Sequence, residues 1–228
     1  MCVHGAWELT PQRVAVHLPT ATAVLADLHL GYAEARQRRG DAVPAQSLGA
    51  LLQPLARVLA QFRVQRVLAA GDLFEDGFEP GLADAFVAWL AQHDTELIGV
   101  VPGNHDRAFA IDRSPQAWPM ALWPQGYRLD DWLVVHGDGT LPDQPIVCGH
   151  LHPSCRAAGR TWPCYLVGPR RIVLPAYSTD ARGAGLDRWT GYRCFVPVGS
   201  EVLDFGSHQS RSRRGARARA RATRRLPG

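Results

Sequence analysis

The first half of the chain alternates short apolar runs with longer segments of helical spacing. Two β-branched runs, RVAVHL and TAVLADLHL, predict adjacent strands within residues 13–30. Leucine and valine recur at helical spacing between Ala45 and Phe62, which predicts a helix that Pro54 would kink or split. The later runs predict a buried strand in VQRVLAAGD, a helix that begins at Pro80 in PGLADAFVAWLAQH, and another strand in TELIGVVPGN. This alternation predicts an α/β fold with parallel strands.

From about Tyr127 the pattern changes to short strands joined by glycine and proline turns. These strands are expected in WLVVHGD, PIVCGH, CYLVG, RRIVLPA and YRCFVPV. Such a half predicts a mixed or second sheet that packs on the first.

The charges are distributed unevenly along the chain. The net charge is +4, yet RSRRGARARARATRRLPG at residues 211–228 holds eight arginines and no acid, which leaves residues 1–210 at −4. We predict one domain over residues 1–207 and a disordered tail over residues 208–228, because arginine repulsion and few apolar residues leave little to offset the entropy of ordering. The arginines of the tail either bind the phosphates of a nucleic-acid backbone or form a solvated extension.

The cysteines and the lengths of the apolar runs bear on whether the protein is secreted, membrane-spanning or cytoplasmic. The five cysteines show no CxxC spacing and cannot all pair within one chain, so we interpret them as reduced, mostly buried thiols. We expect no thiolate zinc site, although Cys155 and Cys164 could meet on folding. No apolar run approaches the roughly 20 residues of a membrane span, and the N-terminus lacks a signal-peptide pattern. A cytoplasmic protein without a membrane partner is expected.

Most predicted strands end in residues that commonly bind metals. In chain order these are Asp27, His29, Asp72, Asn104, His105, His136, His150 and His152. In open α/β sheets, ligands bind beyond the carboxyl ends of the strands, so these side chains should meet. Residues two apart face the same side of an extended chain, so each DxH or HxH pair should face one cavity. Gly71, Gly103 and Gly149 each precede such a residue and permit close backbone approach.

The expected donors are imidazole, carboxylate and one carboxamide, without a thiolate. Such donors suit Mn²⁺, Fe²⁺ or Zn²⁺ better than a soft-metal site or an all-oxygen calcium site. Their number exceeds what one tetrahedral ion needs and suits two ions about 3.5–4 Å apart, which clamp both oxygens of an in-line phosphoryl displacement. The set predicts two divalent metal ions, with Mn²⁺ expected first.

The ordered set DxH, GD, GNHD, H and GHxH resembles the calcineurin-like metallophosphoesterase superfamily. The resemblance implies an α/β/β/α sandwich of two mixed sheets flanked by helices. It implies that Asp27, His29 and His152 hold one metal ion, that Asn104, His136 and His150 hold the other, and that Asp72 bridges them. It further implies that His105 contacts the scissile phosphate and protonates the leaving oxygen, with Asp106 as the carboxylate that orients it.

A narrower resemblance rests on LADLHLGYAEARQRRG, AAGDLF, GNHDR, CGHLHP and LPAYSTDARGAG. These stretches are similar to bacterial metallophosphoesterases described as DNA ligase-associated, over most of residues 20–190. The similarity implies a phosphodiesterase or nuclease that acts on DNA in repair, in functional association with a DNA ligase and a helicase. Two alternatives stay open: a small-molecule phosphodiesterase or phosphatase acting on cyclic nucleotides or nucleotides, and a non-catalytic protein-interaction scaffold.

Arginines near the expected ligands are candidates for binding the substrate phosphate. Arg107 directly follows the GNHD motif, and Arg39 lies in a cluster at residues 36–39. An arginine fork suits phosphate oxygens, whereas the alternative for the cluster is a solvated charged face. Trp118 and Trp123 either stack on unpaired bases or anchor local packing.

Overall fold

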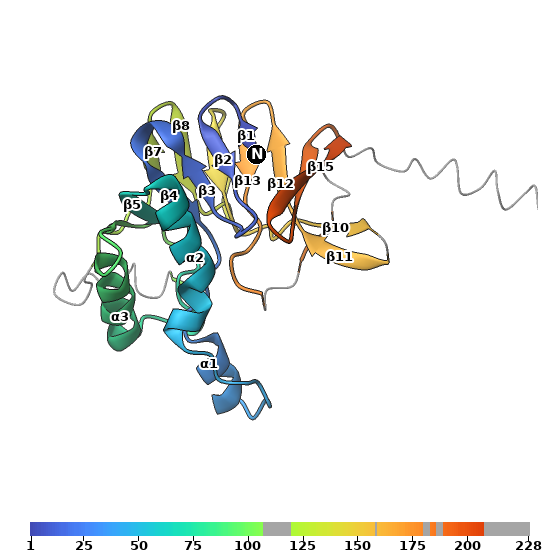
Figure 1. The fold of residues 1–228 in the computed structure, drawn as a ribbon. Coiled ribbons are helices and arrows are strands. Elements are labelled where there is room, and N and C mark those ends of the chain that lie inside the picture. Colours follow the sequence, from blue (N-terminus) through green and yellow to red (C-terminus); the bar gives the residue numbers. More distant parts are fainter. Residues whose placement is uncertain (107–119, 158, 180–182, 186–188, 208–228) are drawn as a thin grey trace, which may run out of the picture.

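The structure is a computed structural model that describes residues 1–106, 120–157, 159–179, 183–185 and 189–207. Two β-sheets pack against each other, and helices cover the first of them (Figure 1). The expected fold class of two mixed sheets with helices is confirmed. All helices in the described part of the chain come from its first half, and none is long and apolar enough to cross a membrane.

The first sheet has six strands in chain order. They are β1 (Cys2–Val3), β2 (Trp7–Leu9), β3 (Ala15–His17), β4 (Thr22–Leu25), β5 (Arg66–Ala69) and β6 (Glu96–Val100). The pairs from β1 to β4 are antiparallel, while β4, β5 and β6 are parallel. The connections hold a short 3-10 turn (Leu18–Thr20), α1 (Tyr32–Arg38), α2 (Leu48–Phe62) and α3 (Pro80–Ala91). The carboxyl ends of β4, β5 and β6 therefore lie at one edge of the sheet.

The second sheet has seven strands in the order β15-β14-β12-β13-β9-β8-β7. Their bounds are β7 (Tyr127–Leu129), β8 (Trp132–Val135), β9 (Ile146–Cys148), β12 (Tyr165–Gly168), β13 (Arg171–Val173), β14 (Arg193–Val198) and β15 (Glu201–Ser207). Strands β8, β9 and β13 are parallel and the other pairs are antiparallel. A separate antiparallel pair, β10 (Ser154–Ala157) and β11 (Arg160–Pro163), projects beside this sheet (Figure 1).

Strand alternation divides the apolar residues into three packed layers. On β4, Ala23 and Leu25 pack with the helices, whereas Val24 packs between the two sheets. On β9, Val147 faces the layer between the sheets, whereas Ile146 and Cys148 face the outer layer of the second sheet. The alternation follows from the two-residue period of a strand. The central strands of both sheets are therefore buried on two faces, which explains their continuous apolar runs.

Helix α2 continues through Pro54 and is not split by it. Proline lacks an N–H and disturbs the hydrogen-bond ladder of the preceding turn. Here the Tyr177 hydroxyl lies between two helix positions: the Leu55 N–H donates to it at 3.2 Å, and the hydroxyl donates to the Leu51 carbonyl at 3.0 Å. The Ser47 hydroxyl caps the N-terminus by accepting from the Ala50 N–H, so the helix begins three residues later than Ala45.

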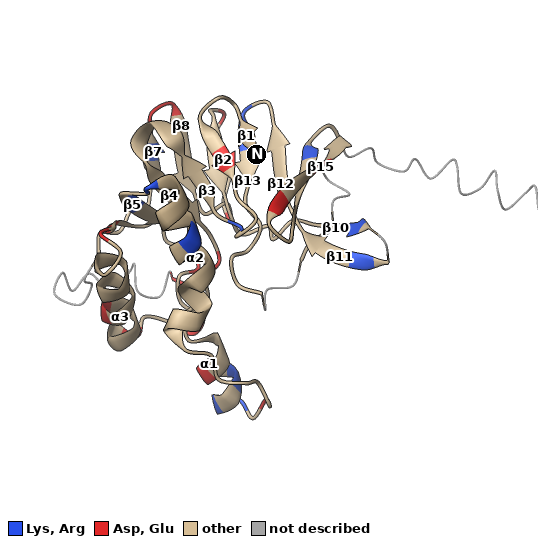
Figure 2. Ribbon diagram, viewed as in Figure 1, with Lys and Arg blue, Asp and Glu red and all other residues tan. Residues whose placement is uncertain are grey.

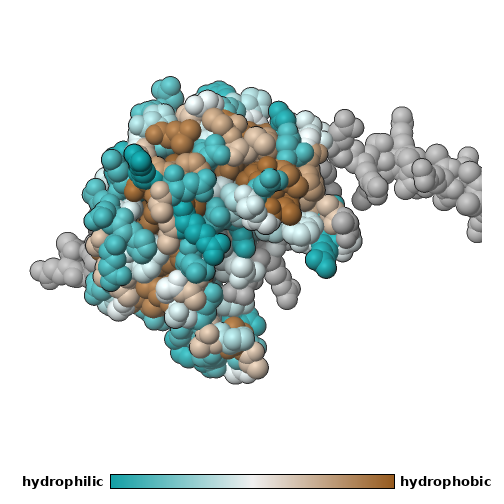
Figure 3. All heavy atoms as spheres, viewed as in Figure 1, coloured by the Kyte–Doolittle hydropathy of each residue, from teal (hydrophilic) through white to brown (hydrophobic). Residues whose placement is uncertain are grey.

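Both signs of charge occur on the surface, and α1 carries acidic and basic side chains together (Figure 2). Figure 3 shows a largely hydrophilic face with apolar areas, one of them near β15. Leu203 and Phe205 on β15, an edge strand, are exposed. The predicted tail at residues 208–228 lies outside the described residues.

Candidate metal centre

All the expected metal ligands lie in loops that follow the carboxyl ends of central strands. Asp27 and His29 follow β4, Asp72 follows β5, and Asn104 follows β6. In the second sheet His136 directly follows β8, and the His150–His152 pair follows β9. The parallel strands of each sheet end at the same edge, so five loops distant in sequence reach one place.

The backbone of these loops differs from the extended chain that the sequence suggested. Asp27, His29, Asp72, His150 and His152 all have left-handed backbone conformations, with φ between 39° and 62°. Alternation in an extended strand is therefore the wrong reason for the pairing of Asp27 with His29 and of His150 with His152. A left-handed conformation costs a non-glycine residue about 1–3 kcal/mol and persists only where the surroundings enforce it. This concentration of strain marks the loops as a functional site.

The expected ligands form two groups whose donor atoms lie within 4.8 Å of one another. Asp27, His29 and His152 make the first group, and Asp72, His136 and His150 make the second. In the first, Nε2 of His152 lies 3.3 Å from a carboxylate oxygen of Asp27. The His150 N–H also donates to the Asp27 carboxylate at 3.1 Å, which ties the two groups together.

Acceptor atoms converge on Nε2 of His136. The Asn104 carboxamide oxygen and Nδ1 of His150 both lie 3.2 Å from it, and Asp72 Oδ2 lies 3.4 Å away. Nδ1 of His136 donates to the Ala70 carbonyl at 3.0 Å, so Nε2 is the ring nitrogen that faces these groups. Burial opposes a charge on His136, but Asp72 outweighs it and raises the pKa of the imidazole to about 9. The surroundings therefore favour a positive charge at this point.

The donor set fits divalent metal ions. Asp27 and Asp72 are 0% and 2% exposed, and buried carboxylates need opposite charge nearby. Their ion pairs among the described residues are with histidines, which become good metal donors when neutral. Nitrogen and oxygen donors of this kind suit Mn²⁺, Fe²⁺ or Zn²⁺.

Glycines allow the loops to approach this closely, and a Cβ on Gly149 would collide with the Ala26 side chain and the Asp27 carboxylate. A Cβ on Gly71, which has φ +91°, would collide with the His136 ring. A Cβ on Gly103 would collide with both the Asp72 carboxylate and the His136 ring. Glycine at these positions is required by the crowding of the site.

The His105 ring is oriented by Glu75 and not by Asp106. Nδ1 of His105 donates to the Glu75 backbone carbonyl at 2.8 Å, so Nε2 takes no part in this hydrogen bond. The Asp106 carboxylate is buried and accepts from the backbone N–H groups of Leu73 and Gly103 at 3.1 and 3.0 Å. Asp106 therefore joins the loop after β5 to the loop after β6, and the orienting role expected of it is corrected.

The sequence did not predict the supporting roles of Glu75, Arg13, Tyr177 and Ser178. The Glu75 carboxylate lies 2.9 Å from Nδ1 of His29, an arrangement that fixes the orientation of a metal-binding imidazole. Arg13 donates to the carbonyls of residues 176–178, and the N–H groups of Tyr177 and Ser178 donate to the carbonyls of Ala26 and Asp27. A sequence signal existed only for Glu75, which is an acidic residue three positions after Asp72.

Of the two expected phosphate-binding arginines, the structure describes only Arg39. The Arg39 guanidinium pairs with Asp76, and Arg107 lies outside the described residues. Trp123 donates to the Ile98 carbonyl at 3.2 Å and packs on the Tyr127 ring, as expected of a packing anchor. Trp118 also lies outside the described residues.

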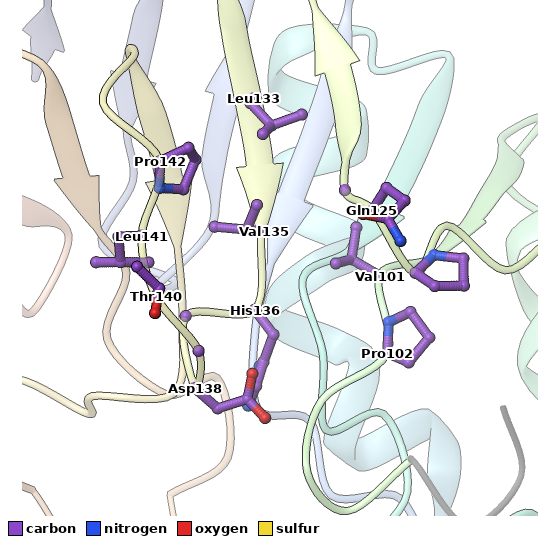
Figure 4. Close-up of a pocket in the computed structure, with 14 residues that line it drawn as sticks. Val101, Pro102, Gln125, Leu133, Val135, His136, Asp138, Thr140, Leu141 and Pro142 are labelled. Atoms are coloured by element: carbon purple, nitrogen blue, oxygen red, sulfur yellow. The ribbon is translucent and has the colours of Figure 1, made fainter. Parts of the chain in front are cut away.

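Three cavities border the ligand groups, and each one contains a different ligand residue. A cavity of about 320 Å³ lies between β8 and the loop at Pro102, with His136 and Asp138 at its lower end (Figure 4). A second, of about 330 Å³, includes His29 and Tyr32, and a third, of about 220 Å³, includes His152 and Arg13. The described residues around the centre thus line more than one open cavity.

Comparison with known proteins agrees with this fold. Residues 21–189 match the family described as calcineurin-like phosphoesterase, so the chain belongs to that family of metal-dependent hydrolases of phosphate esters. Among solved structures, the Pseudomonas putida nuclease MPE has a similar fold, with a TM-score of 0.67 and 19% sequence identity. The similarity covers 89% of this chain and 96% of the nuclease. No curated protein sequence matches this chain significantly.

Proposed function

We propose that this protein is a phosphodiesterase that uses two divalent metal ions, with Mn²⁺ the first candidate, to cleave DNA during repair. Asp27, His29 and His152 would hold one ion, and Asn104, His136 and His150 the other, with Asp72 shared between them. The observation that carries the proposal is the convergence of six of these donors, four of them buried, in two groups in a member of the calcineurin-like family. Bound ions would lower the pKa of the attacking water and stabilise the charge that develops on the phosphate.

His105 is proposed to act on the scissile phosphate. Its Nδ1 is held by the Glu75 carbonyl, so Nε2 is the nitrogen that would contact a phosphate oxygen and pass a proton to the leaving oxygen. The ring centroid lies 4.9 Å from that of His29, next to the first ligand group. A histidine so close to the donors is positioned for general acid catalysis.

DNA is favoured over a small ester by the surroundings of the centre. Separate cavities lie beside His136, His29 and His152, and a polymer needs open access on both sides of its scissile phosphate. The Pseudomonas putida protein of similar fold is a nuclease, which is consistent with this substrate. Two further parts complete the proposal: a cytoplasmic location, from the distribution of apolar residues along the sequence, and functional association with a DNA ligase and a helicase, from the family resemblance.

The first test is hydrolysis of a chromogenic phosphodiester and the matching monoester with Mn²⁺ and after chelation, followed by flapped and single-stranded DNA. Diester and DNA cleavage that require metal would support the proposal. Cleavage of small diesters or monoesters without DNA cleavage would establish the small-molecule alternative. Absence of turnover with Mn²⁺, Fe²⁺ and Zn²⁺, despite bound metal, would favour the interaction scaffold.

Glu75→Gln should weaken metal binding about 10–100-fold, the usual cost of losing a group that orients a metal ligand. The substitution removes the charge beside His29 but keeps the backbone carbonyl that holds His105. The measurement is Mn²⁺ affinity by calorimetric titration. Asp76→Asn is the matched control, since that carboxylate lies in the same loop and pairs with Arg39. Equal affinities in the two variants would show that Glu75 does not support the centre.

Truncation after Ser207 tests the proposal that residues 208–228 form a DNA-binding extension of a single domain at residues 1–207. Removing the eight arginines of residues 211–228 should weaken binding of flapped DNA at low salt. It should also flatten the decline of affinity with salt, because fewer counterions are released from the phosphates. Fluorescence anisotropy over a salt series measures both. Identical curves for the two proteins would show that the segment is only a solvated extension.

A further inference from the structure

Three of the five cysteines meet in a cluster apart from the His/Asp centre. Cys155 comes from β10, Cys164 lies between β11 and β12, and Cys194 comes from β14. Their sulfur atoms all lie within 4.8 Å of one another, and all three residues are buried. Sequence reasoning allowed a meeting of Cys155 with Cys164 but did not foresee Cys194, which is 30 residues further along the chain.

The spacing and surroundings of these sulfurs suit a metal ion. Three thiolates bound to one ion at about 2.3 Å would lie about 3.8 Å apart in a tetrahedral arrangement, so little movement is needed. The neighbours in this outer layer of the second sheet are apolar residues such as Leu166, Val173 and Val196. No imidazole or carboxylate belongs to the group in the described part of the chain. The donor set therefore consists of sulfur, which selects thiophilic ions and discriminates against Mn²⁺.

The three close thiols differ in their tendency to ionise. The neighbouring Cys164 and Cys194 side chains lower the pKa of the Cys155 thiol. Cys155 in turn raises the pKa of Cys194 to about 12 and also raises that of Cys164. A metal ion would displace the remaining thiol protons into solvent, so binding would tighten as the pH rises.

We propose that Cys155, Cys164 and Cys194 form a second metal site, which binds one thiophilic cation such as Zn²⁺ through three thiolates. Three protein ligands leave one coordination position for solvent or another small ligand. This inference concerns a site separate from the phosphoesterase centre and does not depend on its substrate. It revises the expectation that this chain has no thiolate zinc site.

An ion bound at the proposed site would restrain the loop that carries His152. Strand β10 begins two residues after His152, and the Cys164 N–H donates to the Pro153 carbonyl at 2.9 Å. Cys194 lies on β14 in the large sheet, where it pairs with Leu166 of β12. An ion bound to all three sulfurs would link the β10–β11 pair to this sheet. The site is thus placed to stabilise one end of the metal-ligand loops.

The test is titration of the reduced full-length protein with Cd²⁺, followed by the ultraviolet charge-transfer band of cadmium bound to thiolate. Nitrogen and oxygen donors of the His/Asp centre give no such band. We expect one sulfur-bound Cd²⁺ per chain, tighter binding at higher pH, and a rise in the thermal midpoint. Cys164→Ala and, separately, Cys155→Ala should lose the band, so the test does not depend on the folding of one variant.

Cys148→Ala is the matched control, because Cys148 is buried in the same layer but is not part of the three-cysteine group. This variant should keep the band. Absence of the band in the reduced wild-type protein, or its survival in both Cys164→Ala and Cys155→Ala, would overturn the proposal. A disulfide between two of the three cysteines, with no band after reduction, would also overturn it.

Discussion

Asp72→Asn should lower kcat for phosphodiester hydrolysis by at least about 10²–10³-fold. That is the usual effect of removing one group that stabilises charge in the transition state. Burial opposes ionisation of Asp72, but hydrogen bonds from His136 and the His105 N–H outweigh it and lower the pKa of the carboxyl to about 2. Asp72 is therefore anionic at any working pH. Asparagine has the same shape and can still accept from the His105 N–H, but it supplies no charge to share between two cations.

The measurement is kcat on the chromogenic diester at saturating Mn²⁺, together with metal content by elemental analysis. Asp84→Asn, at an exposed position on α3, is the control and should match the wild type in both. We expect Asp72→Asn to hold less metal while it keeps the wild-type circular dichroism spectrum. Full activity and full metal content in this variant would exclude Asp72 as the shared ligand.

His105→Ala should lower kcat by about 10²–10⁴-fold, the usual contribution of a general acid, while metal content stays at the wild-type level. The expected separation of activity from metal binding follows from the position of the ring. Nδ1 is held by the Glu75 carbonyl, so only Nε2 remains to contact a substrate. His4→Ala, at an exposed position, is the control and should retain both properties.

The choice of leaving group distinguishes proton donation from simple phosphate binding. A chromogenic phenolate leaves readily without a proton, whereas a deoxyribose oxygen of DNA does not. If His105 protonates the leaving oxygen, its removal should cost more with DNA than with the chromogenic diester. An equal loss with both substrates would assign His105 to phosphate binding. A loss of bound metal in His105→Ala would instead make it a ligand.

Local sequence pattern predicted the central strands well because burial on two faces leaves continuous apolar runs. β4, β5, β6, β8, β9, β12, β13 and β14 all fall within runs that predict strands. Helix α1 was not predicted, since it buries only Ala33 and Ala35 and shows no apolar stripe. Strands β1, β2, β10 and β11 were not predicted, because their sequences, CV, WEL, SCRA and RTWP, form no continuous apolar run.

The candidate site was predicted in its residues but not in its geometry. Asp27 with His29 and His150 with His152 were paired on the assumption of an extended backbone, yet all four are left-handed. Asp106 was expected to orient His105, yet its carboxylate bonds backbone N–H groups of two neighbouring loops. A spacing of one or two residues constrains side-chain direction only when the backbone conformation is known. The backbone conformation of the loops that follow the strands was not known from the sequence.

The sequence by itself determined which donors the chain offers and that they follow the ends of buried strands, because apolar period and turn residues are local properties. The tertiary structure alone decided which donors share a group, that the Glu75 carboxylate lies beside His29, and that Cys194 joins Cys155 and Cys164. These relations depend on strand order and sheet packing, which bring residues more than 100 positions apart, such as Asp27 and His150, within hydrogen-bonding distance. No pattern within a single segment contains that information.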